Sequence, residues 1–309
     1  MSYRVAINGF GRIGRNYLRC VLERGLLGHG IRVVAVNDLW DPATLAHLLE
    51  YDTTFGKLRW DVTHDDAGFG VGGQRIPTFR EKDPAVLPWG NLEADLVIES
   101  TGKMRSRDDA ARHLKAGAGR VLVSAPGKGV DATLVVGVNQ TTYDPRQHEI
   151  LSAASCTTNC AAPMVKVLHE AFGVVRGFLT TVHAYTNDQP VLDTPHKDLR
   201  RARSAAVNII PTTTGAARAI GLVLPDVAGR LDGVALRVPV EDGSICDLAV
   251  ELAMPATAAE VNAAFARAAA GDLAGILKYA ETPLVSRDVV GDPASCVFDA
   301  ALPSPTASW

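Results

Sequence analysis

Short apolar runs alternate with segments of helical spacing through the first half of the chain. The apolar runs predict β-strands, and the segments between them carry apolar residues three and four positions apart, which indicates helices. The strands are expected at 3–9, 31–38, 94–100 and 120–126, and the helices at 12–27, 41–51 and 107–117. A glycine-rich stretch around 68–73 predicts no regular structure. Apolar strands separated by helices favour a parallel, doubly wound sheet of the Rossmann type.

The pattern changes in the second half. A helix is expected at 162–172, followed by longer, partly alternating strands at 177–186, 230–240 and 244–253. These strands favour an antiparallel or mixed sheet with helices on one face. The run 257–270 predicts a helix that begins with a capping box, formed by Thr257 and Glu260. The chain is therefore expected to be an α/β protein with domains at 1–153 and 154–309.

The composition is that of a soluble globular protein and disfavours nucleic-acid and membrane binding. The chain has 309 residues, of which 47% are hydrophobic and 21% charged, as in soluble globular proteins large enough for two domains. A net charge of −3 provides no basic surface for nucleic acid or membranes. The 5 cysteines are odd in number and scattered, which favours reduced thiols and a cytoplasmic location. The N-terminus shows no signal-peptide pattern, and no apolar run approaches the roughly 20 residues of a membrane span.

A dinucleotide site is indicated near the N-terminus. Gly9, Gly11 and Gly14 form G-x-G-x-x-G directly after a predicted strand and at the start of a helix. In this context the glycines permit a tight turn, a close approach to a pyrophosphate and close helix–strand packing. Asp38, at the end of the second strand, would accept hydrogen bonds from a ribose and repel the 2′-phosphate of NADP. NAD is therefore the expected cofactor, although Asp38 could also be a turn residue.

Candidate chemistry lies in the stretch ASCTTNCAAP at 154–163. Cys156 precedes good N-cap residue types and a predicted helix, and the helix dipole at that end favours a thiolate. Two other interpretations remain: a zinc site, or two small core thiols with Cys160. A zinc site needs further ligands at metal spacing, which the isolated remaining cysteines do not provide, so no metal is expected.

A base for this thiol is available in the following strand. His183 lies on that strand with Thr181 and Tyr185 on the same face, 27 residues beyond Cys156. One short helix and a returning strand would bring the imidazole to the helix N-terminus. A histidine on a strand is more often a packed residue. Its pairing with a cysteine beside a dinucleotide site suggests aldehyde oxidation through a thioester.

These residues resemble a known family. The segments INGFGRIGR, SAPGKG, AASCTTNCAAP, TVHAYTNDQ, NIIPTTTGAA and ALRVPV are similar to those of the phosphorylating glyceraldehyde-3-phosphate dehydrogenases. The resemblance extends over about the first 300 residues. It implies oxidation of glyceraldehyde 3-phosphate with NAD and inorganic phosphate, giving 1,3-bisphosphoglycerate. Domain 1–153 would then bind NAD and domain 154–309 would be catalytic.

The resemblance also implies residue roles. Cys156 would be the nucleophile, and His183 would take its proton and assist hydride transfer. The cofactor would be bound by Gly9, Gly11, Arg12, Ile13, Gly14, Asp38, Arg80, Thr101, Ser124 and Asn187. The substrate phosphate would lie against Thr186, Asp188 and Arg237, and the attacking phosphate against Thr157, Arg201, Thr214 and Gly215, with Ser155 beside it. Arginine and turn hydroxyls suit phosphate chemically.

Further implications concern specificity and assembly. Pro195 agrees with an NAD-type site, whereas Thr194 replaces a leucine that is usual in NAD-specific members, which implies some tolerance of NADP. The segment 186–206 resembles a loop that reaches the cofactor site of a neighbouring subunit, and the family is typically a homotetramer. The three arginines of this segment could otherwise form a solvated charge run.

The chain departs from the family after residue 300. It reads ALPSPTASW where members continue with a strand, a stretch that holds the nicotinamide carboxamide, and a final helix. Pro303 and Pro305 disfavour a replacement strand. Phe55 also stands where many members carry histidine. The expectation is a shortened or altered end, and two alternatives remain open: erythrose-4-phosphate dehydrogenase, or a non-catalytic paralogue with a binding or regulatory role.

Overall fold

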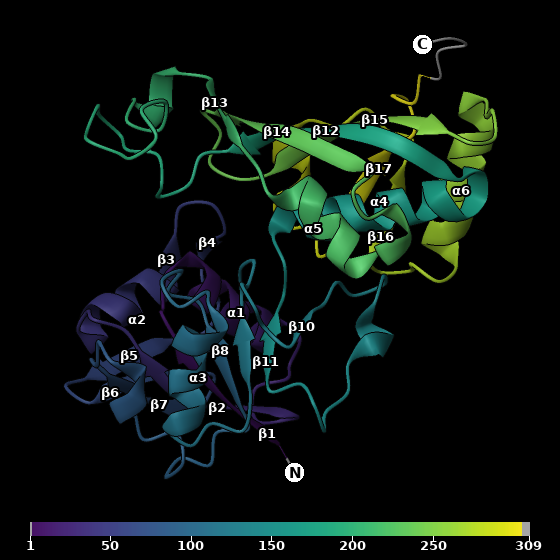
Figure 1. The fold of residues 1–309 in the computed structure, drawn as a ribbon. Helices are drawn as coiled ribbons and strands as arrows, with labels where there is room; N and C mark the ends of the chain where they lie inside the picture. The colour runs from purple at the N-terminus through teal and green to yellow at the C-terminus, as the bar shows by residue number, and fades with distance from the viewer. Residues whose placement is uncertain (1, 305–309) are drawn as a thin grey trace. The chain divides into compact units, whose positions relative to one another are not determined.

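The computed structural model describes residues 2–304, which form two compact units (Figure 1). Among the described residues, unit 1 consists of 2–134 and Tyr143–Ala154, and unit 2 of Val135–Thr142 and 155–304. The main division follows Ala154, one residue after the expected end of the first domain. The segment Val135–Thr142 packs with unit 2, which no pattern in the sequence indicated.

Unit 1 is built on one sheet with the strand order β10-β11-β9-β8-β1-β2-β7-β6-β5. Neighbouring strands are parallel from β10 to β7, whereas β7, β6 and β5 pair antiparallel. The Rossmann-type α/β interpretation is confirmed. The strands are β1 (Tyr3–Asn8), β2 (Ile31–Asn37), β5 (Val62–Asp65), β6 (Gly68–Val71), β7 (Gln74–Phe79), β8 (Leu96–Glu99), β9 (Val121–Val123), β10 (Ala132–Thr133) and β11 (Ile150–Ser152), with a separate hairpin of β3 (Tyr51–Asp52) and β4 (Gly56–Lys57).

The expectation of irregular structure around 68–73 was wrong. Gly72 and Gly73 have φ angles of 58° and 76°, in the left-handed region, and they form the two-residue connection between β6 and β7. Two successive glycines with positive φ make the turn that best matches the twist of an antiparallel hairpin. The glycines therefore mark a hairpin added to the edge of the parallel sheet.

Helices cover both faces of the sheet in unit 1. They are α1 (Arg12–Glu23), α2 (Pro42–Glu50) and α3 (Arg107–Lys115), with the 3-10 turn η1 (Pro84–Val86). Successive residues of β1 serve opposite faces: Ile7 packs with Leu18 of α1 and Leu45 of α2, whereas Ala6 packs with Trp89. Burial on both faces explains why β1 and β2 are almost continuously apolar.

Unit 2 holds a mixed four-stranded sheet with the order β13-β14-β12-β15. β12 is parallel to β14 and antiparallel to β15, and β13 is antiparallel to β14, which confirms the expected mixed sheet. α4 and α5 lie along one face of this sheet (Figure 1). The bounds are α4 (Cys156–Phe172), β12 (Val174–Ala184), β13 (Ile210–Thr213), α5 (Ala216–Val223), β14 (Leu231–Val238), β15 (Ser244–Leu252), α6 (Ala258–Ala270), β16 (Leu277–Ala280) and β17 (Cys296–Asp299), with the 3-10 turns η2 (Gln140–Thr142), η3 (Ala205–Val207), η4 (Pro225–Val227) and η5 (Ser286–Val289).

Two local expectations can be compared with these elements. The capping box of Thr257 and Glu260 is present at the start of α6, as the sequence predicted. Pro303 follows β17 in a stretch without regular structure, and Pro305 with the residues after it lies outside the described residues. Within residues 2–304, no helix combines the length and the apolar character that crossing a membrane requires.

Candidate active site

The start of α4 positions the candidate nucleophile. Ala154 has a φ of 58°, an uncommon value for a residue with a side chain, and turns the chain from β11 into the helix. The Ser155 hydroxyl then accepts a hydrogen bond from the Thr158 amide at 3.0 Å, so Ser155 is the N-cap and Cys156 is the first helical residue. The expectation that Cys156 precedes the helix and that later residues cap it was wrong. Cys156 lies within the first turn, where the helix dipole favours an anion most.

β12 brings an imidazole to this thiol. The Nε2 atom of His183 lies 3.2 Å from the Sγ atom of Cys156. His183 is the penultimate residue of β12, the strand that follows α4 directly. The distance is a hydrogen-bond distance for sulfur, so a proton can pass between the two side chains.

β14 places a guanidinium on the other side of the same imidazole. Arg237 is paired with His183 in the β12–β14 register, and its Nη1 atom lies 2.6 Å from Nδ1. Arg237 Nη1 also donates to the Ala184 carbonyl oxygen at 2.9 Å. Nδ1 also lies 2.6 Å from that carbonyl oxygen, which can only accept, so Nδ1 contacts one donor and one acceptor and these contacts do not fix the tautomer. In the imidazolium form, Nδ1–H donates to the Ala184 carbonyl oxygen and Nε2–H donates toward Cys156 Sγ, which stabilises a thiolate.

The cysteines of the chain differ in acidity. Cys156 is accessible to solvent, but the side chains around its sulfur partly desolvate it, which acts to raise its pKa. The hydrogen bond and the charge of His183, with the Thr157 amide, outweigh this effect and lower that pKa below the ordinary value. At Cys160 the contact with Cys246 acts to lower the pKa, but the contact with Cys296 and burial outweigh it and raise the pKa. The contact with Cys160 and burial likewise raise the pKa of Cys246, and burial raises that of Cys20. The thiolate character expected from the sequence is therefore specific to Cys156 among these four.

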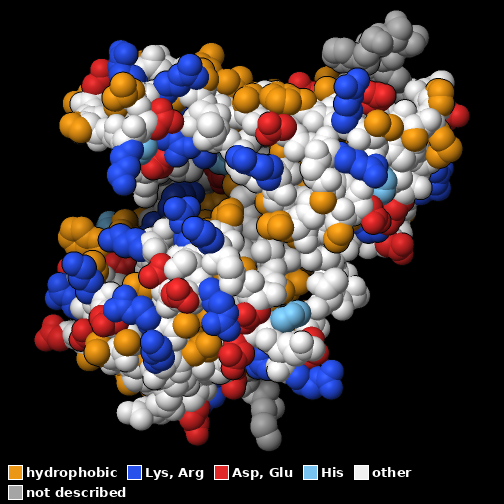
Figure 2. All heavy atoms as spheres, viewed as in Figure 1, with side chains coloured by type: hydrophobic (Ala, Val, Ile, Leu, Met, Phe, Trp, Pro, Cys, Tyr) orange, Lys and Arg blue, Asp and Glu red, His pale blue; other side chains and the backbone are white. Residues whose placement is uncertain are grey.

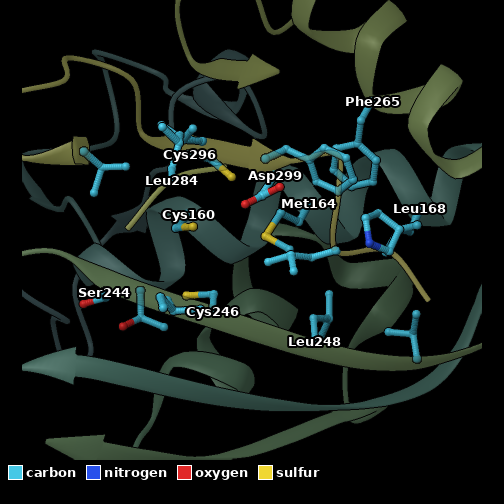
Figure 3. A pocket seen from close by; sticks show the side chains of 18 of the residues that line it. Cys160, Met164, Leu168, Ser244, Cys246, Leu248, Phe265, Leu284, Cys296 and Asp299 are labelled. Carbon is cyan, nitrogen blue, oxygen red and sulfur yellow. The ribbon is translucent and has the colours of Figure 1, made fainter. Parts of the chain in front are cut away.

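A cavity of about 900 Å³ in unit 2 gives access to this pair. Cys156 and His183 line it, together with Cys160. Figure 3 shows Cys160 on α4 near Cys246 on β15 and Cys296, with Met164, Leu168, Leu248 and Phe265 forming an apolar part. No group of three or more His, Cys, Asp and Glu suited to a metal ion occurs in the described part of the chain.

Arg237 has a buried donor that an anion could bind. Its Nε atom is buried and has no hydrogen-bond partner among the described residues. Burial lowers the pKa of Arg237, the nearby charges of Cys156 and Asp188 oppose that shift, and Arg201 adds to it. A buried donor without a partner is uncommon, and an anionic group bound at this position would satisfy it.

The second candidate arginine is held in place by a network. Arg201 forms an ion pair with Asp188, and its Nε atom donates to Thr212 Oγ1 at 2.8 Å. Thr212 in turn donates to Asp198 at 3.3 Å, and His196 Nε2 lies 3.4 Å from Asp188. The sequence analysis did not identify Thr212. The alternation of burial along β13 turns Thr212 inward, and recognising that strand would have revealed it.

The remaining phosphate candidates lie in turns. The amide of Thr186 donates to Gln189 Oε1 at 3.0 Å, and its hydroxyl donates to the same oxygen at 3.1 Å. Gln189, which the sequence analysis also missed, is buried and shapes this turn. The Thr214 hydroxyl accepts from the Ala216 amide at 3.1 Å, and Gly215 precedes α5 with open space around its Cα atom.

The glycine turn of unit 1 has the spacing that a dinucleotide needs. Gly9 has a φ of 90°, and a Cβ atom there would lie 2.6 Å from the Thr101 amide nitrogen. A Cβ atom on Gly14 would lie 2.2 Å from the Gly9 carbonyl oxygen, whereas Gly11 faces open space. Gly11 precedes α1, whose N-terminus has no side-chain cap. The turn thus leaves helix amides available to a pyrophosphate, and the residues fit the expected cofactor.

The other cofactor candidates are distributed around this turn. Asp38 Oδ2 accepts from the Phe10 amide at 2.7 Å, which ties the turn to the end of β2. Arg12 forms an ion pair with Asp52 at 3.3 Å, Ile13 is exposed, Arg80 donates to the Leu39 carbonyl oxygen at 3.3 Å, and the Ser124 amide donates to the Glu99 carbonyl oxygen at 3.0 Å. Asn187 belongs to unit 2, where it is exposed after β12.

Comparisons with known proteins agree over almost the whole chain. Residues 3–107 match the family model described as glyceraldehyde 3-phosphate dehydrogenase, NAD binding domain, and residues 155–306 match that of the C-terminal domain. The chain is 58% identical to glyceraldehyde-3-phosphate dehydrogenase 2 of Streptomyces avermitilis, with 98% of this chain and 89% of that protein covered. It is 59% identical to the glyceraldehyde-3-phosphate dehydrogenase of Streptomyces coelicolor, over 98% and 89%. It is 56% identical to that of Geobacillus stearothermophilus, over 97% and 88%.

Proposed function

The chain belongs to the glyceraldehyde-3-phosphate dehydrogenase family, and from this premise we propose how its residues carry out the NAD-dependent oxidation of glyceraldehyde 3-phosphate. Relatives of 53% to 59% identity bear that name, and neither erythrose-4-phosphate dehydrogenase nor a non-catalytic role gains support from them. The proposal rests on one observation: the Cys156 thiol, at the first turn of α4, lies 3.2 Å from His183 Nε2.

The first step is attack by sulfur on the aldehyde. Cys156 gives its thiol proton to His183 Nε2, and the thiolate forms a bond to the aldehyde carbon as the carbon–oxygen double bond opens. The imidazolium then returns the Nε2 proton to the carbonyl oxygen. The product is a hemithioacetal with a hydroxyl group beside the imidazole. Throughout this step Nδ1 keeps its proton and donates it in a hydrogen bond to the Ala184 carbonyl oxygen at 2.6 Å. Nε2 can therefore donate a proton in this step and accept one in the next.

Oxidation and phosphorolysis follow at the same sulfur. NAD, when bound, supplies the hydride acceptor. His183 takes the proton of the hemithioacetal hydroxyl as the carbon loses its hydride, which leaves a thioester on Cys156. Inorganic phosphate then attacks the thioester carbon, the Cys156 thiolate leaves, and the acyl phosphate 1,3-bisphosphoglycerate is released.

Two anion sites serve these steps. We assign the substrate phosphate to Thr186 and Arg237, with Asp188 beside them, because Arg237 presents an unpartnered buried donor next to His183. The attacking phosphate is assigned to Thr157, Arg201, Thr214 and Gly215, with Ser155 at the helix start. Asp188 is a carboxylate and would repel a phosphate, so its role here is to orient Arg201 through their ion pair.

The cofactor side is assigned to unit 1. Gly9, Gly11 and Gly14 would receive the pyrophosphate with Arg12 and Ile13, and Asp38 the adenosine ribose, with Arg80, Thr101 and Ser124 as further candidates in unit 1. Asn187, which belongs to unit 2, is a cofactor candidate from the family resemblance alone. Asp38 would repel a 2′-phosphate, which agrees with NAD as the cofactor.

We expect a phosphate-dependent rise in NADH when purified protein receives glyceraldehyde 3-phosphate and NAD. Omitting phosphate should stop turnover after the thioester forms, and erythrose 4-phosphate and NADP should each support lower kcat/KM. The measurement is absorbance at the NADH wavelength with each aldehyde and each cofactor. Absence of phosphate-dependent NADH formation, or a preference for erythrose 4-phosphate, would refute the assignment.

We propose that the chain assembles as a homotetramer. Between β12 and β13, Val191, Leu192 and Leu199 are 77%, 77% and 80% exposed, and Val207 and Ile209 are also exposed. Figure 2 shows hydrophobic side chains on this part of the surface. A cluster of exposed apolar side chains on one loop indicates an interface, and a second copy of the chain is the partner we propose.

We propose a cytoplasmic location. All five cysteines are free, and Cys156 is exposed to solvent. A reactive thiol of this kind stays reduced in the cytosol, whereas an oxidising compartment would inactivate it.

A further inference from the structure

A buried polar network lies beneath the glycine turn of unit 1. Glu99, the last residue of β8, is 2% exposed, and His113 on α3 is fully buried. His113 Nε2 lies 2.9 Å from Glu99 Oε2. Burying two titratable groups is costly, and a pair of apolar residues would fill the space at lower cost. The network therefore calls for a functional explanation, and the aldehyde chemistry of unit 2 does not provide one.

A tryptophan fixes the protonation of His113. The indole Nε1 of Trp89 lies 2.9 Å from His113 Nδ1. Because an indole nitrogen can only donate, Nδ1 must be unprotonated, and the single imidazole proton resides on Nε2. His113 is thus a neutral imidazole held in one tautomer, and it donates to Glu99.

Glu99 connects this histidine with the cofactor side of the sheet. Its Oε2 atom accepts from His113 and from the Asn8 side chain at 2.6 Å. Its Oε1 atom accepts from the Thr101 amide at 2.8 Å and from the Thr101 hydroxyl. His113 and Asn8 therefore hold Oε2 in place, and Oε1 holds Thr101. The orientation of the Glu99 carboxylate thus sets the position of Thr101.

Thr101 supports the glycine turn. Its amide nitrogen would lie 2.6 Å from a Cβ atom at Gly9, so the two backbones are in close contact. Next to it, the Ser100 hydroxyl donates to the Gly9 carbonyl oxygen at 2.6 Å. A displacement of Thr101 therefore displaces Gly9, the first glycine of the turn.

We propose that His113 is a positioning residue for NAD binding: through Glu99 and Thr101 it holds the Gly9 turn in the conformation that receives the pyrophosphate. This inference rests on the proposed role of the glycine turn. Preorganisation of a binding loop increases affinity by lowering the conformational cost of binding. His113 is fully buried, so its effect on NAD is transmitted through the side chains of Glu99 and Thr101.

The test is a pair of variants at this position. His113→Leu removes the donor to Glu99 and leaves the Trp89 indole without an acceptor. His113→Gln can keep both, because its amide nitrogen replaces Nε2 and its oxygen accepts from Trp89. We expect the dissociation constant for NAD, measured by isothermal titration calorimetry, to rise about tenfold in the Leu variant, the effect of one hydrogen bond to a charged group. The Gln variant should stay within about threefold of wild type, close to the effect of a weak neutral bond.

Two controls separate this inference from a general loss of structure and from a failure of the proposed function. The alkylation rate of Cys156, which lies in unit 2, should be unchanged in both variants, whereas a general loss of structure would change it. Equal NAD affinity of the Leu variant and wild type, or an equal loss in both variants, would overturn the inference. Failure of wild type to bind NAD would instead refute the proposed function.

A measurement on wild type covers the case in which the Leu variant does not fold. In protein with ¹⁵N-labelled histidine, His113 should show a protonated Nε2 and an unprotonated Nδ1. Titration with NAD should move the Nε2–H resonance, because contact at the glycine turn is transmitted through Thr101 and Glu99. A resonance that stays fixed up to saturation would overturn the inference.

Discussion

Cys156→Ser is expected to reduce phosphate-dependent NADH formation by about 10⁴-fold or more. A serine hydroxyl at this position is not ionised near neutral pH, and removal of a nucleophile that acts together with its base eliminates most of the rate enhancement. Cys156 belongs to unit 2, whereas the glycine turn proposed to bind NAD belongs to unit 1, so the dissociation constant for NAD should remain within about twofold of wild type, a change of less than 0.5 kcal/mol. The measurements are steady-state kinetics and NAD titration.

Cys20→Ser is the matched control for this prediction. Cys20 is accessible to solvent on α1, and partial desolvation by its neighbours raises the pKa of its thiol, which disfavours a thiolate. Its replacement should leave kcat and KM unchanged. If Cys156→Ser kept more than about a tenth of the wild-type rate, well above what loss of a nucleophile allows, the thioester pathway would be excluded.

The second large effect is expected for His183→Asn. Loss of the imidazole removes the proton acceptor of the oxidation step, and general acid–base catalysis of this kind contributes about 10² to 10⁴ in kcat. It also removes the hydrogen bond and charge that lower the pKa of Cys156, so that pKa should rise. The pH at which the remaining activity reaches half its maximum should therefore move upward.

His29→Asn is the comparison for that variant. His29 is exposed in the turn before β2, and its replacement should change neither kcat nor the pH profile. A His183→Asn enzyme with an unchanged pH profile would show that another group sets the acidity of the thiol.

In unit 1 the sequence predicted two features best: strands that are buried on both faces and a turn that only glycine can occupy. The strands 3–9 and 31–38 are apolar because both faces of the sheet are covered, and Gly9, Gly11 and Gly14 occupy a turn that a Cβ atom would obstruct at the first and third positions. The hairpin at Gly72 and Gly73 was missed because glycine-rich composition was interpreted as irregularity. The feature that indicates a hairpin is the pair of successive glycines between two short strand-forming segments.

In unit 2 the sequence predicted which residues would take part but not how they are connected. The spacing of Cys156 and His183 allowed the pair to be inferred, whereas the contact between Arg237 and His183 depends on the register of β12 against β14. That register is set by strands far apart in the sequence, which local patterns do not encode. The same reason applies to Glu99 and His113, because their contact joins the end of a strand to the buried face of the next helix.

The start of α4 illustrates a finer limit. Several residues of the stretch 155–159 are good N-caps, and the choice among them decides whether Cys156 lies before the helix or within it. Ser155 takes the position because the chain leaves β11 through the left-handed conformation of Ala154, which orients the next residue toward the Thr158 amide.

Alkylation of Cys156 by iodoacetamide, followed by mass spectrometry as a function of pH, examines the reactive pair without cofactor or substrate. A neutral reagent reports the thiolate fraction, so the rate should reach half its maximum clearly below pH 8.5, the ordinary value for cysteine, and this midpoint should move up in His183→Asn. A midpoint at or above that of an ordinary thiol in the wild-type protein would contradict a preformed thiolate held by His183 at the start of α4.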